Sequence, residues 1–185
     1  MRKLKLFLSL LMLTAFGVGS VWADDPSESI DLSKGSFSTD HITWSGTSCT
    51  VQQIKGSSST NVNSSYVSAP RVYKGHILSF EAKTGYKIKS ISITVSSTYY
   101  GNSMTAGTAI SSNTVTDNTT AVSRTWTSTS GGSHVVSSVS NEGLDNIYIQ
   151  NVASTNVQLR FTAISVTYIA SGSQESDEYL MQNRY

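Results

Sequence analysis

Residues 76–95, HILSFEAKTGYKIKSISITV, decide the fold class of this chain. In the first half apolar and polar side chains alternate, and the apolar face consists of Leu78, Phe80 and Ala82. A period of two is typical of a β-strand with one buried face, because successive side chains in a strand point to opposite sides. Thr84-Gly85 marks a tight turn, and residues 86–95 continue as a longer run. The stretch therefore predicts two strands joined by a short turn.

The second of these strands changes the face on which its apolar residues lie. Ile88 belongs to one face, whereas Ile91 belongs to the other. Residues 157–168 show the same change, between Ala163 and Ile164. A change of face within one strand requires a β-bulge or a passage from one sheet environment to another. Both strands are long for this chain, and we expect them to be central.

Shorter alternating segments flank these strands. They are separated by Gly, Ser and Asn turns, and none has the 3.6-residue period of a helix. The segments cover residues 41–44, 50–54, 71–73, 124–127, 135–139 and 146–150. Residues 105–122 fit either short strands or a long loop. We expect an all-β protein, a two-sheet β-sandwich that is jelly-roll-like with about eight strands.

The same pattern divides the chain into parts. The β-sandwich domain is expected to cover residues 37–170. Before it, residues 24–36 are polar and predict a flexible leader, with at most one edge strand around Ile30. After it, residues 171–185 lose the alternation and predict a loose polar tail.

Residues 1–23 have the organisation of a secretory signal peptide. A positively charged start precedes an apolar run over residues 6–18, and a small-x-small cleavage pattern ends at Ala23. An uncleaved membrane anchor is the alternative, although the run is shorter than the roughly 20 residues of a spanning helix. We expect export across the inner membrane to the periplasm, the outer surface or the medium, with no transmembrane helix after cleavage.

Composition and charge exclude several classes of protein. Serine and threonine are the commonest residues and charged residues make up only 14% of the chain, which excludes a coiled coil. Cleavage after Ala23 would remove three basic residues and no acidic one, which changes the net charge from +1 to −2. A nearly neutral chain with scattered basic residues has no electrostatic footprint for nucleic acid. The single cysteine, Cys49, excludes an intramolecular disulfide, and we expect it to be a small buried side chain.

Four segments carry a resemblance to a known kind of module. They are RVYKG (71–75), LSFEA (78–82), GYKIKSISITV (85–95) and VQLRFTAISVTY (157–168). With these segments the chain, over roughly residues 37–169, resembles small secreted bacterial β-sandwich modules similar to the carbohydrate-binding-type accessory domains of Gram-negative glycan degraders. The resemblance implies a non-catalytic module with a jelly-roll-like fold. It assigns no binding residues.

Templates for catalysis are missing from the sequence. HExxH, CxxC and GxSxG motifs and a phosphate-binding glycine loop are all absent. The acidic residues fall on an outward strand position or in turns, which does not favour the paired carboxylates of a glycosidase. We therefore expect no enzyme activity, no cofactor and no metal. A calcium loop is the alternative for Glu142, Asp145 and Asn146.

Aromatic side chains near strand ends are the remaining signal. Sugar-binding sites place flat rings against the apolar faces of pyranose rings, and use amide, guanidinium or carboxylate groups for the hydroxyls. The candidate ligand-binding residues are Trp44, Arg71, Tyr73, Tyr99, Tyr100 and Trp126. Packing in the sandwich core is the alternative for each ring.

These observations favour two functions. The first is a secreted non-catalytic binding module, for carbohydrate through exposed aromatic residues. The second is a structural or adhesive cell-surface component that assembles through sheet edges, since low-charge, Ser/Thr-rich strands guard their edges poorly. A small secreted enzyme or inhibitor is a third alternative. The expected partners are a glycan, further copies of the chain or surface proteins, and no nucleic acid.

Overall fold

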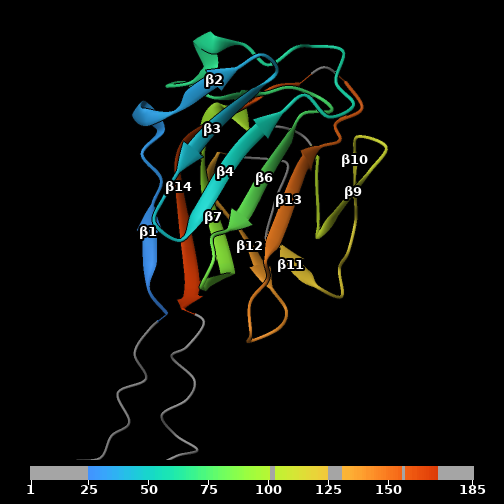
Figure 1. Cartoon of the computed structure of the whole chain (residues 1–185). Helices are drawn as coiled ribbons and strands as arrows, with labels where there is room; N and C mark the ends of the chain where they lie inside the picture. Colours follow the sequence, from blue (N-terminus) through green and yellow to red (C-terminus); the bar gives the residue numbers. More distant parts are fainter. Residues whose placement is uncertain (1–24, 101–102, 125–130, 156, 171–185) are drawn as a thin grey trace, which may run out of the picture.

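The computed structural model describes residues 25–100, 103–124, 131–155 and 157–170, and this part of the chain forms a two-layer β-sandwich (Figure 1). Two six-stranded antiparallel sheets pack against each other, and a separate hairpin joins β9 (Ala109–Ser111) to β10 (Thr114–Thr116). The described helical segments are two short 3-10 turns, η1 (Leu32–Lys34) and η2 (Ser64–Tyr66). The predicted fold class is confirmed.

Sheet A contains the two long strands that the sequence predicts as central. Its order is β1-β14-β7-β12-β11, and β5 also pairs with β14. The strands of sheet A are β1 (Ser27–Ser29), β5 (Arg71–Val72), β7 (Tyr86–Tyr100), β11 (Val122–Arg124), β12 (Gly132–Ser138) and β14 (Leu159–Ala170).

Sheet B contains β6, the first of the two strands predicted within residues 76–95. Its order is β2-β3-β4-β6-β13-β8. The strands of sheet B are β2 (Ser36–Ser38), β3 (His41–Ser45), β4 (Cys49–Ile54), β6 (Ile77–Ala82), β8 (Met104–Gly107) and β13 (Asn146–Asn151).

The chain crosses repeatedly between the two sheets. From β5 it passes to β6 in sheet B, returns to β7 in sheet A and goes back to β8, and the sequence β12, β13, β14 alternates in the same way. As a result β14 lies between β5 and β7, while β13 lies between β6 and β8. This interleaving of late strands between early ones gives the sandwich a jelly-roll-like topology. The connection from β6 to β7 is therefore a turn between sheets, with Gly85 at a φ of 86°.

The core lies between the sheets and is almost entirely aliphatic and aromatic. Leu78 and Phe80 are fully buried whereas Glu81 is exposed, as the alternation predicts. Cys49 is also buried as expected, and burial raises the pKa of its thiol to about 12. The largest fully buried side chains are Trp44, Phe80, Ile42, Ile77, Leu78, Ile88, Ile91, Ile93, Ile147, Ile149, Leu159 and Ile164.

The change of face in β7 occurs where the sequence predicts it, whereas that in β14 lies slightly earlier than predicted, because Ala163 is exposed. Thr167 pairs with Ser90 but Tyr168 pairs with Ile88, so Lys89 is an extra residue in β7. Nearer the start of β14, Phe161 is opposite Val95 and Ala163 is opposite Thr94, which makes Thr162 an extra residue in β14. Each irregularity restores burial of the next apolar residues, because one inserted residue exchanges the two faces of a strand.

The interval predicted as a flexible leader is instead part of the sandwich. β1 pairs with β14, and Ile30 is 5% exposed within the core. The carboxylate of Glu28 accepts hydrogen bonds from the backbone N–H groups of Thr47 and Ser48, which ties β1 to the turn between β3 and β4. The edge strand expected around Ile30 is present as β1, although its sequence Ser-Glu-Ser has no apolar alternation.

The number of strands also exceeds the expected eight. The structure adds β2, of three residues, to the predicted segments, and the Thr-rich interval 105–122 forms β8, β9 and β10. Such short pairings leave too little periodicity for sequence patterns to detect. In the same described residues, no helix is long and apolar enough to span a bilayer.

Candidate ligand-binding site

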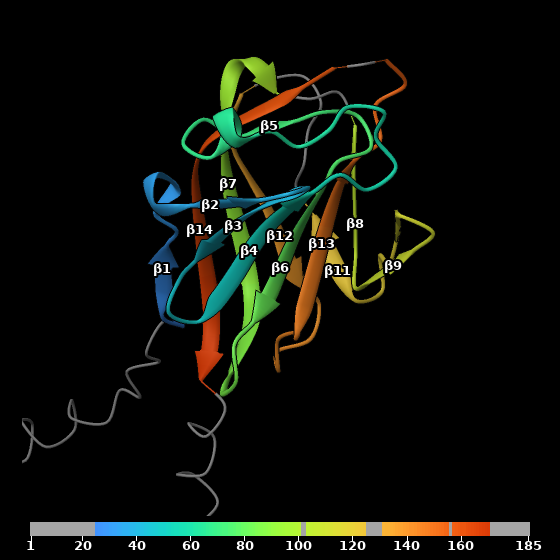
Figure 2. The ribbon, with the colours of Figure 1, turned by 45° about the horizontal axis from the view of Figure 1, so that its top comes forward.

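One end of the sandwich carries a pocket bordered by two arginines. Figure 2 shows β5, the end of β7 and the start of β14 together at this end, opposite the start of β1 and the end of β14. The pocket encloses about 370 Å³. We call it the arginine pocket, and its lining consists of Ser68, Ala69, Pro70, Arg71, Ser96, Tyr99, Arg160, Phe161 and Thr162.

The short pairing of β5 with β14 places the arginines beside each other. Val72 is opposite Leu159, and both of these side chains are fully buried in the core. Arg71, the residue before Val72 in β5, is opposite Arg160, the residue after Leu159 in β14. Because neighbouring side chains in a strand point to opposite faces, both arginines lie on the face of sheet A turned away from the core.

Tyrosine rings hold both guanidinium groups. The guanidinium carbon of Arg160 lies 3.8 Å from the ring centroid of Tyr99, and that of Arg71 lies 5.4 Å from the centroid of Tyr66. Tyr66 in turn contacts Tyr73, with ring centroids 6.0 Å apart. A cation over the face of an aromatic ring is attracted by the ring quadrupole. The rings therefore fix the two arginines at the mouth of the arginine pocket.

A buried polar network holds the backbone of β5. Gln53 Nε2 donates to the carbonyl of Arg71 at 2.7 Å and lies 3.0 Å from Nδ1 of His76. His76 Nε2 is 2.8 Å from the carbonyl of Thr60, and a carbonyl accepts only, so Nε2 carries the proton and Nδ1 accepts. Burial lowers the pKa of His76, which keeps its ring neutral in this role.

The structure brings together some of the predicted site residues. Arg71 and Tyr99 both line the arginine pocket, and Tyr73 reaches Arg71 through the ring of Tyr66. Trp126 and the side chain of Tyr100 lie outside the described parts of the chain.

Trp44 packs in the core, which is the alternative given for each ring, and does not take the predicted ligand-binding role. Its side chain is fully buried, meets Phe161 edge to face at 6.0 Å, and donates its indole N–H to the carbonyls of Leu32 and Val67. A ring enclosed in this way does not contact a ligand, and we leave Trp44 out of the candidate site. The sequence misleads here because an aromatic residue near a strand end looks the same whether its neighbours cover it or not.

Two site residues escaped the sequence analysis. Arg160 has the opposite parity to Leu159 and Phe161, which is a signal that it faces outward. Tyr66 lies in η2, where no periodicity exists, and no sequence signal places it beside Arg71. Tyr66 comes to lie beside Arg71 only in the folded chain.

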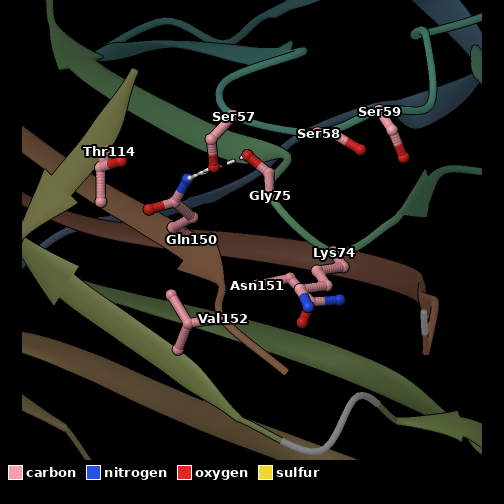
Figure 3. A pocket seen from close by; sticks show the side chains of 9 residues that line it. All are labelled: Ser57, Ser58, Ser59, Lys74, Gly75, Thr114, Gln150, Asn151 and Val152. Atoms are coloured by element: carbon pink, nitrogen blue, oxygen red, sulfur yellow. Dashed lines mark hydrogen bonds between the residues drawn. The ribbon is translucent and has the colours of Figure 1, made fainter. Parts of the chain in front are cut away.

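A second, larger cleft of about 530 Å³ has a different chemistry. Figure 3 shows the Gln150 amide in its wall, donating to Ser57 Oγ at 3.2 Å and to the carbonyl of Gly75 at 2.9 Å. Its oxygen accepts from the backbone N–H of Val115. The cleft is lined by Ser57, Ser58, Ser59, Lys74, Gly75, Thr114, Gln150, Asn151 and Val152. It offers no aromatic ring, and its amides bind the protein's own loops.

The ionisable groups that catalysis or a metal would use are dispersed. His41 lies beside Asp40 at 3.0 Å on the surface, whereas His76 and His134 are buried. Asp145, one of the alternative calcium ligands, accepts from Lys87 at 2.6 Å. Within the described residues no three His, Cys, Asp or Glu side chains are grouped as metal ligands.

Comparisons with protein-family models, with curated proteins and with solved structures found no match to this chain. The site itself therefore carries the argument about function.

Proposed function

We propose that this chain is an exported, non-catalytic binding module for carbohydrate, and that the arginine pocket is its binding site. The observation that supports the proposal best is the stack of Arg160 on Tyr99 at the edge of a pocket of about 370 Å³. Small-ligand sites combine apolar and aromatic surface with a few fixed polar groups in volumes of about 300–1,000 Å³.

Several parts of the lining have a use in holding a sugar ring. The ring of Tyr99 supplies apolar surface for the C–H face of a pyranose, whereas Pro70 and Phe161, which also line the pocket, are buried. The guanidinium groups of Arg71 and Arg160 supply N–H donors for sugar oxygens. Half-buried donors held by rings lose little conformational freedom when a ligand binds, which favours affinity.

The lining supports binding without hydrolysis. A glycosidase needs two carboxyl groups on either side of the scissile bond. None of the residues that line the arginine pocket is Asp, Glu or His. We therefore assign no reaction to this pocket.

The proposal includes export, on the evidence of the first 23 residues. The pocket and the ends of the described domain are at opposite ends of the sandwich: Tyr168 near the end of β14 donates its N–H to the carbonyl of Pro26. Both ends of the described domain therefore lie at the end of the sandwich remote from the pocket.

The sheet edges give less support to assembly through strand addition. The outermost strands β1, β11 and β2 have three residues each, and β8 has four. Short edge strands are one of the ways in which proteins prevent edge-to-edge pairing.

The test is a glycan array with the protein lacking residues 1–23, followed by calorimetric titration of any saccharide that binds. We expect Tyr99→Ala to weaken binding about tenfold or more, which corresponds to about 1.4 kcal/mol. Tyr148→Ala is the matched control, because Tyr148 is also half-buried but lies on sheet B. Equal binding by the two variants, or no binding to any saccharide, would contradict the proposal.

A further inference from the structure

The arginine pocket places two positive charges where a sheet ordinarily avoids them. Arg71 and Arg160 are directly opposite each other in the register of β5 and β14. Directly opposite side chains lie on the same face with Cβ atoms about 4.5–5.5 Å apart, and like charges at such positions destabilise the pairing. Both arginines line the same pocket.

No acidic side chain of the described residues forms an ion pair with either arginine. Arg160 Nε donates to the neutral amide oxygen of Gln158 at 3.1 Å, and Arg71 Nε is buried without a hydrogen-bond partner. Among the described residues, the lysines and arginines that form ion pairs are Lys34, Lys87, Lys89 and Arg124.

Stacking holds the guanidinium groups while leaving their donors available. Tyr99 and Tyr66 contact Arg160 and Arg71 through the faces of the rings. The N–H donors of a guanidinium lie in its own plane, in a fork that matches the two oxygens of a carboxylate or sulfate. An arginine held by a ring thus keeps an edge free for a bidentate anion.

We infer that the arginine pocket selects acidic saccharides, with the anionic group of the sugar bound between Arg71 and Arg160. This inference rests on the proposed carbohydrate function and adds the charge of the ligand to it. A carboxylate or sulfate offsets the repulsion between the two arginines, whereas a neutral sugar leaves it in place. Without residues 1–23 the chain carries a net charge of −2, so the attraction is local to the pocket.

The test compares ligands that differ in charge but little in shape. Titrations use trigalacturonic acid, its methyl ester, a sulfated galactose trisaccharide and a neutral galactose trisaccharide. We expect the uronate or the sulfated sugar to bind at least tenfold more tightly than the ester and the neutral sugar, with an advantage that shrinks as salt screens the charges. The tighter binder of the two anionic sugars shows whether the pocket prefers a carboxylate or a sulfate.

Three variants assign the selectivity to the arginines. Arg71→Gln and Arg160→Gln should each reduce the preference for the acidic sugar about tenfold, and Arg160→Lys should retain only part of it, because lysine keeps the charge but lacks the fork. Arg124→Gln is the control, since Arg124 lies on β11 and pairs with Asp117 at 2.8 Å. If a variant fails to fold, the comparison of acid with ester on the unaltered protein still decides.

The outcomes separate the two proposals. Equal affinity for acid, ester and neutral sugar, with Tyr99→Ala still abolishing binding, would overturn the acidic selectivity and leave the carbohydrate function intact. If the unaltered protein binds none of the four saccharides and nothing on the full array, both proposals are overturned.

Discussion

Replacing Trp44 separates a core role from a ligand-binding role more sharply than any other single change. The indole is fully buried, packs edge to face on Phe161, and donates one N–H between the carbonyls of Leu32 and Val67. Trp44→Ala removes the whole ring, and truncation of a buried tryptophan costs about 3–5 kcal/mol of unfolding free energy. For a domain of this size such a loss lowers the melting temperature by roughly 6–20 °C.

Trp44→Phe isolates the hydrogen bond from the packing. A phenyl ring keeps most of the contact with Phe161 but leaves two part-buried carbonyls without this donor, which costs about 1 kcal/mol. Urea unfolding followed by far-ultraviolet circular dichroism measures both variants, because the backbone signal does not depend on the tryptophan that was removed. We expect the ligand affinity of folded Trp44→Phe to equal that of the unaltered protein.

Two results would refute this reasoning. An unchanged unfolding midpoint for Trp44→Ala would show that the indole is not part of the core. A folded Trp44→Phe variant that no longer binds a ligand of the unaltered protein would place Trp44 in the binding site.

Two further predictions concern the dependence of stability on pH. Burial opposes ionisation of Glu28, but hydrogen bonds from Ser48 and Thr47 outweigh it and lower its pKa below the usual value of 4.5. Glu28→Gln should therefore lower the free energy of unfolding by about 1 kcal/mol at neutral pH. The stabilities of the variant and the unaltered protein should converge as the pH falls through the folded-state pKa of Glu28. Burial lowers the pKa of His76 below 6.5, so the unfolded chain binds the proton more readily. Stability should fall as the pH drops from 6.5 toward the folded-state pKa. Urea midpoints between pH 5 and pH 8 should show this slope, and a His76→Gln variant with an undiminished slope would contradict it.

The long strands show what local pattern can predict. The changes of face between Ile88 and Ile91 and between Ala163 and Ile164 required irregular pairing, and the structure has an extra residue at Lys89 and at Thr162. The prediction succeeded because the pleat ties every side chain to one face, so burial of the next isoleucines fixes where the pairing must shift.

The short strands show where local pattern fails. β2 has three residues, too few for an alternation, and exists because β3 offers it a partner. The same limit applies to the site: Arg71 and Tyr99 were identified from sequence, but Tyr66 and the contact of Arg71 with Arg160 were not.

The all-β class, the two central strands and their bulges can be inferred from the amino-acid pattern alone, because those properties follow from a period of two within single segments. The pairing of β5 with the start of β14, the enclosure of Trp44 and the placing of two arginines beside one pocket arise only when the chain folds. These features depend on contacts between segments about 90 residues apart in the chain, as for Arg71 and Arg160. No local pattern records which distant segment supplies the other half of such a contact.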